Sequence, residues 1–247
     1  MNFYKLIIAY DGTDYQGWQK QKDVKTISGE LLKTFKKVFN QNPTIIGASR
    51  TDAGVHALNQ IARIKTKLKI ETSKMLLAWN NKLPGDITIR TIENCNENFY
   101  PLKNVKQKTY FYHFFLERPL PFNQRYGHFH HWPIDLKKLE KSLKIFIGKH
   151  DFRSYSTGYE MESTIRTIDD IKLIYIPEIN VYRIEVKGKS FLHHMIRRIV
   201  GASLEVASRK QLKIEYLQQV LDEKDQEQTL PSAPAKGLML SEIIFEH

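Results

Sequence analysis

The chain has 247 residues, of which 41% are hydrophobic and 11% aromatic, so it can bury one large core or two smaller ones and is not compositionally disordered. Its 38 Lys and Arg residues outnumber 27 Asp and Glu, and the resulting charge of +11 is spread along the sequence. This excess favours a polyanionic partner over a merely solvated lysine-rich face. The single Cys95 excludes an internal disulfide, argues against a structural zinc site and fits a reducing, cytoplasmic setting.

The first hundred residues predict alternating strands and helices. The N-terminal apolar run, residues 1–10, lacks a preceding basic region and meets Asp11-Gly12 too soon for a signal peptide, so it is interpreted as a strand. Hydrophobic periodicity then predicts a helix capped at Ser28, strands over 43–48 and 59–65, a helix around 75–79 and a strand over 87–92. The order β-α-β-β-α-β is typical of a ferredoxin-like unit.

The second half repeats this kind of pattern. We expect a strand over 110–116, a mainly helical stretch over 136–147, a strand pair over 168–176 and 181–186, helices over 192–207 and 216–221, and a closing strand over 238–245. These elements predict an α+β protein. We expect two domains, residues 1–104 and 105–247.

The stretch S-R-T-D-A-G-V-H-A at residues 49–57 carries the candidate chemistry. It joins two predicted strands, so Asp52 is expected on a loop. Asp-Ala-Gly is also ordinary turn chemistry, because Asp caps its own backbone and Gly54 adopts positive φ without steric cost. The basic charge, and basic residues interleaved with aromatics over 103–114, favour a functional interpretation involving phosphates and unpaired bases.

Five motifs together resemble the tRNA pseudouridine synthase A family. They are Y-D-G-T-D-Y-Q-G-W-Q at 10–19, R-T-D-A-G-V-H-A at 50–57, L-P-G-D-I at 83–87, F-L-H-H-M-I-R-R-I-V-G at 191–201 and A-P-A-K-G-L at 233–238. The resemblance spans nearly the whole chain, and R-T-D-A-G-V-H-A is much more specific than a lone glycine pattern.

The resemblance implies two ferredoxin-like halves that form one extended antiparallel sheet, with helices packed mainly on one face. It also implies a homodimer that isomerises uridines 38, 39 and 40 in the anticodon stem-loop of tRNA. Forming pseudouridine breaks the bond between uracil N1 and ribose and rejoins the base through C5, so no atom is gained. The reaction therefore needs neither a cofactor nor a metal, and neither DNA nor a membrane is an expected partner.

The resemblance also implies residue roles. Asp52 is the catalytic carboxylate, either as a nucleophile at ribose or as a base that permits elimination. Beside these family roles, we expect Arg50 to fill the gap left by an extruded uridine or to hold a neighbouring phosphate, its alternative being a plain surface arginine. Tyr110 lies against the uracil ring, its alternative being a core aromatic whose face Tyr112 shares. Arg197 is the basic partner of the carboxylate, although by residue type alone Arg198 is as plausible.

One departure from the family pattern concerns RNA selection. Where the family usually has F-H-A-R ahead of the active-site tyrosine, this chain has F-Y-P-L at residues 99–102, so a histidine and an arginine expected to touch RNA are absent. Lys103 or Lys106 could supply charge, but lysine lacks the planar fork of arginine. This departure predicts weaker or altered RNA selection.

The histidine clusters do not predict a metal site. Strand alternation places His131 opposite His128 and His130, and adjacent His193 and His194 on a predicted helix point about 100° apart. The main alternative to an enzyme is a non-catalytic tRNA-binding or chaperone protein, which basic charge and aromatics serve equally well. A metal-dependent nuclease would need clustered carboxylates, and Asp169-Asp170 is a poor candidate.

Overall fold

The structure is a computed structural model that describes residues 1–158 and 163–246. Contacts group these residues into two compact units. Unit 1 contains Met1–Lys106 together with residues 239–246, and unit 2 contains Gln107–Leu238. The division of the chain into folding domains at residue 104 stays a prediction.

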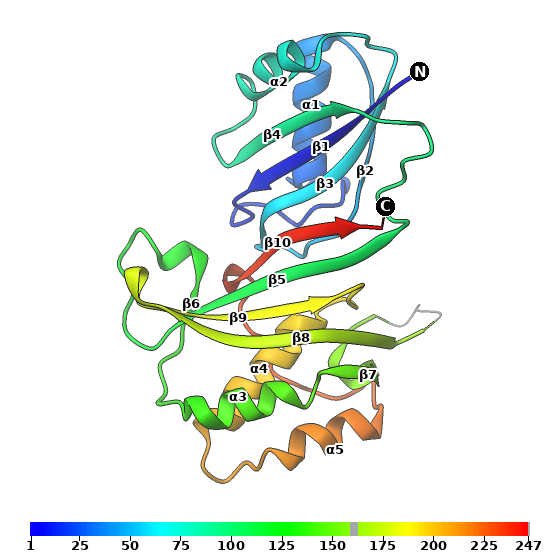
Figure 1. Cartoon of the computed structure of the whole chain (residues 1–247). Coiled ribbons are helices and arrows are strands. Elements are labelled where there is room, and N and C mark those ends of the chain that lie inside the picture. The colour runs from blue at the N-terminus through cyan, green and yellow to red at the C-terminus, as the bar shows by residue number, and fades with distance from the viewer. Residues whose placement is uncertain (159–162, 247) are drawn as a thin grey trace. The chain divides into compact units, whose positions relative to one another are not determined.

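Unit 1 contains strands on which two helices pack (Figure 1). Its elements are β1 (Asn2–Tyr10), α1 (Ile27–Phe39), β2 (Thr44–Gly47), β3 (His56–Thr66), α2 (Thr72–Asn80), β4 (Ile87–Asn94) and β10 (Leu238–Phe245). β1 lies between β3 and β4 and is antiparallel to both. β2 pairs antiparallel with the second half of β3, and β10 pairs parallel with its start. The predicted β-α-β-β-α-β order is confirmed.

The core of unit 1 follows from strand alternation and one helix stripe. Alternate residues of β1, from Tyr4 to Tyr10, are buried. Phe35 of α1 meets Trp79 of α2 edge to face at 4.8 Å, and the Trp79 indole N–H donates to Thr34 Oγ1 at 2.9 Å. The prediction of Ser28 as the cap of α1 is wrong. Thr26 caps the helix, since its Oγ1 accepts from the Gly29 amide at 3.3 Å, and Ser28 lies inside the first turn.

Unit 2 is built on antiparallel strands in the order β5-β9-β8-β7, with β6 parallel to β5. Its elements are β5 (Val105–Phe115), β6 (His128–Phe129), α3 (Leu136–Lys144), β7 (Gly148–Asp151), β8 (Ile165–Ile176), β9 (Val181–Gly188), α4 (Met195–Ser208) and α5 (Glu215–Glu223). The described part of unit 2 also contains short 3₁₀ turns over Gln124–Tyr126, Arg153–Tyr155, Pro177–Ile179 and Ala235–Gly237. In Figure 1, α4 lies behind β8 and β9, and α3 packs along it.

Helix α4 is the central helix of unit 2, because ten of its residues are buried. Small residues within it permit close packing: a Cβ at Gly201 would lie 2.1 Å from the carbonyl oxygen of Pro231. The segment that precedes the last strand therefore runs directly over α4. The helix begins at Met195, later than the predicted start at residue 192, with consequences for the histidines described below.

The predicted α+β class is confirmed by this mixture of helices and mostly antiparallel strands. Among the described residues, no helix combines the length and apolar character that a bilayer crossing requires.

Candidate active site

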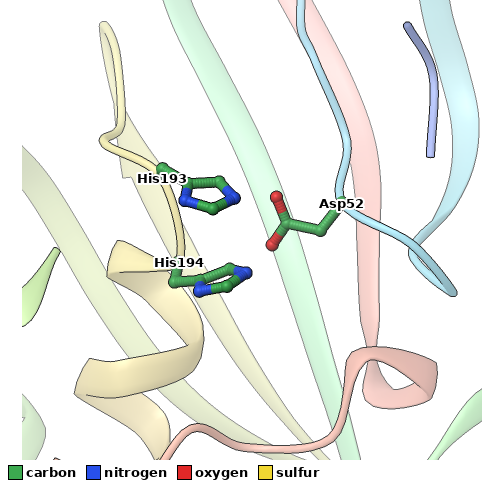
Figure 2. A group of neighbouring side chains, drawn as sticks. All are labelled: Asp52, His193 and His194. Carbon is green, nitrogen blue, oxygen red and sulfur yellow. The ribbon is translucent and has the colours of Figure 1, made fainter. Parts of the chain in front are cut away.

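Asp52 lies on the loop between β2 and β3, as predicted, and its half-buried side chain projects from that loop (Figure 2). The loop closes in a turn in which the Val55 amide donates to the Asp52 carbonyl at 3.2 Å. Gly54 supplies the positive φ of +76° that this turn needs. Asp-Ala-Gly therefore forms an ordinary turn, and this turn is compatible with a functional role for the Asp52 side chain.

A buried glutamine holds the start of this loop. The side-chain carbonyl of Gln60 accepts from the Ser49 amide at 3.2 Å, and its NH₂ group donates to the Ser49 carbonyl at 2.7 Å. Gln60 is fully buried, so losing either bond would leave a polar group without water. The side-chain amide of Gln60 therefore fixes the backbone at Ser49, three residues before Asp52.

The segment from Asp11 to Trp18 supports the other side of the loop. The Trp18 amide donates to the Thr51 carbonyl at 3.1 Å, and the Gly54 amide donates to the Tyr15 carbonyl at 3.2 Å. A Cβ at Gly17, where φ is +82°, would lie 2.5 Å from the Thr51 carbonyl oxygen. Residues 10–19 therefore form a cradle for the Asp52 loop, which their sequence alone does not predict.

Asp86, from the L-P-G-D-I motif, anchors this cradle in turn. The Tyr15 hydroxyl donates to Asp86 Oδ1 at 2.6 Å, and the Asp11 amide donates to the Asp86 carbonyl at 2.9 Å. Burial, together with the Asp86 carboxylate, raises the pKa of Tyr15 well above its ordinary value, so the phenol stays neutral and remains a donor. Three motifs that are distant in sequence thus position one carboxylate.

Arg50 lies two residues before Asp52 on the same loop, with its side chain exposed. Thr51 between them is buried. The loop therefore presents a guanidinium to solvent beside a half-buried carboxylate. A charged planar group in this position can contact a phosphate or stack on a base.

Tyr110 lies in β5 of unit 2, paired with Val186 of β9, and is almost fully buried. Its ring meets Phe191 edge to face, with ring centroids 5.4 Å apart. Tyr112, two residues on, is also buried, in keeping with the predicted shared face, and its hydroxyl donates to the Pro234 carbonyl at 3.1 Å. Lys108 precedes Tyr110 by two residues, and burial lowers its pKa to about 8. The basic and aromatic pattern over 103–114 predicts surface cations and does not indicate that Lys108 is partly enclosed.

The two arginines of α4 have different surroundings. Arg197 donates from Nε to the Ala233 carbonyl at 2.8 Å, and the Ala233 amide donates back to the Arg197 carbonyl at 2.9 Å. Arg198 instead donates to the carbonyls of Ser154 and Ser156 at 3.0 and 2.9 Å. Ala233 of the A-P-A-K-G-L motif therefore holds Arg197 in place, whereas Arg198 stabilises the turn that contains Ser154 and Ser156.

The prediction that His193 and His194 point about 100° apart on a helix is wrong. Both precede α4, and their rings stack at 3.8 Å because His194 adopts a left-handed conformation with φ of 59° (Figure 2). Thr157 Oγ1 lies 2.6 Å from His193 Nδ1 and 3.1 Å from His194 Nδ1. That no metal binds these histidines stays a prediction.

A fixed carboxylate on a rigid loop suits a nucleophile or a general base, because the supporting bonds reduce its freedom before substrate arrives. The hydrogen bonds given above for the Asp52 loop join residues of unit 1, and those between Arg197 and Ala233 join residues of unit 2.

Comparison with known proteins matches the chain to the family described as tRNA pseudouridine synthase, over residues 6–101 and 143–246. It is 35% identical to tRNA pseudouridine synthase A of Thermodesulfovibrio yellowstonii, over 98% of each chain. It is 36% identical to tRNA pseudouridine synthase A 2 of Bacillus anthracis, over 99% of this chain and 100% of the relative. It is 34% identical to tRNA pseudouridine synthase A of Clostridium kluyveri, again over 99% and 100%.

Proposed function

Because the chain belongs to the tRNA pseudouridine synthase family, and is thus an isomerase acting on tRNA uridine, we propose that it modifies uridines 38, 39 and 40 of the anticodon stem-loop. We further propose that it does so in the cytoplasm, as a homodimer. The observation that carries the proposal is Asp52, a carboxylate whose loop is braced by Gln60 and by residues 10–19.

The reaction needs one carboxylate and no redox partner. The glycosidic bond from ribose C1′ to uracil N1 breaks, the base turns, a bond forms from C1′ to C5, and the C5 proton moves to solvent while N1 gains one. Asp52 can add to C1′ and leave again, or can take a proton from C2′ to permit elimination. Either route places Asp52 against the ribose of the target nucleotide.

The other residues take supporting roles in this proposal. Tyr110 packs against the uracil ring and assists proton movement at C5. Arg197 is the basic group of the active site, oriented by its bond to the Ala233 carbonyl. Arg50 contacts the RNA that surrounds the extruded base, since a uridine stacked in an RNA arm must leave the stack to react.

The sheet of unit 1 offers a surface suited to RNA. The side chains that alternate with its buried core residues include Lys5, Arg63 and Lys65. The Arg63 guanidinium and the Lys65 ammonium lie over the ring of Phe3, at 5.3 and 5.8 Å from its centroid. Cations interleaved with an aromatic ring suit a phosphate backbone and unpaired bases.

The departure at residues 99–102 lies beside this surface. The Arg63 guanidinium donates to the carbonyls of Glu97 and Phe99, both at 2.8 Å, and lies 5.3 Å from the centroid of Tyr100. Lys103 lies 6.0 Å from the same ring. Cations therefore surround Tyr100 where the family pattern has histidine. This favours a second candidate, a paralogue that modifies another tRNA subset or position.

Mapping pseudouridines in unmodified tRNA after incubation with the purified protein tests the proposal. New pseudouridines at 38, 39 and 40 would support it. Modification only at other positions would favour the paralogue. Tight tRNA binding without any new pseudouridine would support the RNA-binding alternative and overturn the proposed reaction.

A further inference from the structure

Unit 2 contains a cavity of about 540 Å³ that the proposed reaction does not use. Its lining includes His128 of β6, His130 and Trp132 after that strand, Ser208 and Arg209 at the end of α4, and the segment 231–234. Pockets that bury small ligands span roughly 300–1,000 Å³, so this cavity is large enough to take one.

Trp132 gives the cavity an exposed aromatic surface. Its exposure is 71%, whereas Trp18 and Trp79, the other two tryptophans of the chain, are buried. An indole left in water keeps both a flat apolar face and an N–H donor available to a partner. Aromatic faces of this kind bind nucleic-acid bases by stacking.

The histidines give the cavity a neutral hydrogen-bonding edge. The Ser208 hydroxyl donates to the Leu204 carbonyl at 2.7 Å, so its oxygen can only accept from His130 Nε2, which lies 2.8 Å away. His130 therefore carries its proton on Nε2, and its Nδ1 is an acceptor. Burial lowers the pKa of His130, and lowers that of His128 to about 4, so both imidazoles are neutral at physiological pH.

Cations lie at the end of α4 beside the cavity. Arg209 lines it, forms an ion pair with Glu205 at 2.9 Å and keeps an exposed side chain. Lys210 and Lys213 follow within four residues and are exposed. This basic segment can hold the phosphate that flanks a base, whereas an uncharged ligand would leave it unused.

We propose that this cavity binds one unpaired nucleotide of the RNA substrate, outside the target uridine. The base stacks on the Trp132 indole, its polar edge faces His128 and His130, and its phosphate lies near Arg209 and Lys210. The proposal rests on the proposed function for the identity of the RNA, but nucleotide binding itself does not depend on catalysis.

Fluorescence of Trp132 provides a local readout, because it is the exposed tryptophan. We expect pentauridylate to quench the intrinsic fluorescence saturably, and Trp132→Phe to abolish the quenching. We expect Trp132→Ala to weaken binding of labelled pentauridylate about tenfold, within the range found for base stacking. Arg209→Ala should flatten the salt dependence of binding. Phe122→Ala, which removes an aromatic side chain of unit 2 that is 84% exposed, is the matched control and should bind as the parent does.

The proposal is overturned if pentauridylate does not bind, if Trp132→Ala and the parent bind it equally, or if quenching persists in Trp132→Phe. Fluorescence that changes with protein concentration alone would instead assign the cavity to contact with a second copy. The same preparations are assayed for tritium release from tRNA labelled at uridine C5. Nucleotide binding through Trp132 without tritium release would reject the reaction and keep the cavity. Tritium release with an unchanged KM for tRNA in Trp132→Ala would support the reaction and reject the cavity as a binding site for the RNA substrate.

Discussion

The Tyr10 hydroxyl lies 2.8 Å from Oγ1 of Thr51, the residue directly before Asp52, and both side chains are buried. Tyr10 is the last residue of β1, so the end of the first strand is tied to the loop that carries the candidate catalytic carboxylate. The position of Asp52 thus depends on the sheet as well as on its own turn.

Tyr10→Phe removes this hydrogen bond and keeps the ring. We expect the free energy of unfolding to fall by about 1 kcal/mol, the typical contribution of one hydrogen bond. We expect kcat on tRNA to fall more than KM rises, because a displaced carboxylate impairs the reaction rather than binding. Tyr4→Phe is the control: its hydroxyl donates to the Leu68 carbonyl at 3.2 Å from the same strand. Urea denaturation and steady-state kinetics of both variants check this, and equal kcat values would contradict it.

Gly17→Ala should displace the Asp52 loop. The new Cβ would lie 2.5 Å from the Thr51 carbonyl oxygen, in a left-handed conformation that alanine disfavours. We expect a loss of about 1–3 kcal/mol in stability and a larger relative loss of activity. Gly85→Ala is the matched control, since open space surrounds Gly85. A fully active Gly17→Ala variant would show that the cradle does not set the position of Asp52.

The secondary structure was predictable because hydrophobic periodicity is a local property. The alternation in β1 and the apolar stripe of α1 mark their buried faces directly. The capping error arose because Thr26 and Ser28 are both good capping residues, and only the backbone geometry distinguishes them. The cradle formed by residues 10–19 depends on contacts between segments about 35 residues apart, which no periodicity reports.

Arg197→Lys and Arg198→Lys should separate the activity from the stability of unit 2. Lysine carries its charge on one terminal ammonium, so it cannot both donate to the Ala233 carbonyl, as Arg197 Nε does, and present further charged N–H groups to the active site. We therefore expect kcat to fall about tenfold or more in Arg197→Lys. Arg198→Lys loses bonds to the carbonyls of Ser154 and Ser156, and should lower stability by about 1–3 kcal/mol with little change in kcat. The reverse pattern of effects would assign the basic group to Arg198.

Stability should depend on pH through His128. Burial, with smaller effects of His130, Lys236 and His131, lowers the pKa of His128 to about 4 in the folded protein, whereas an unfolded histidine titrates near 6.5. Between these values the unfolded chain binds a proton that the folded chain does not, so stability falls as pH falls from about 6.5 to 4. His128→Phe should reduce this dependence. Urea denaturation at several pH values compares the slopes, and identical slopes would show that His128 does not contribute.

The roles of the candidate site residues could be predicted only where a motif of this sequence resembles the family pattern. Asp52 is expected on a loop from the residues alone, but no sequence rule shows that Asp86 accepts a hydrogen bond from Tyr15, whose carbonyl is bonded to that loop. The stacking of His193 on His194 was missed because a helix was extended by three residues. The backbone of His194 is left-handed, so the two imidazole rings stack. In a helix the two side chains would point in different directions.

The most direct test of the central claim is tritium release from tRNA labelled at uridine C5, measured for the parent and for Asp52→Asn, which removes the charge with little change in shape. Asp23→Asn is the control, because it removes an exposed carboxylate elsewhere in unit 1. We predict release by the parent and by Asp23→Asn, and none by Asp52→Asn at equal tRNA affinity. Release by Asp52→Asn at the parent's rate, or no release by the parent, would contradict the account.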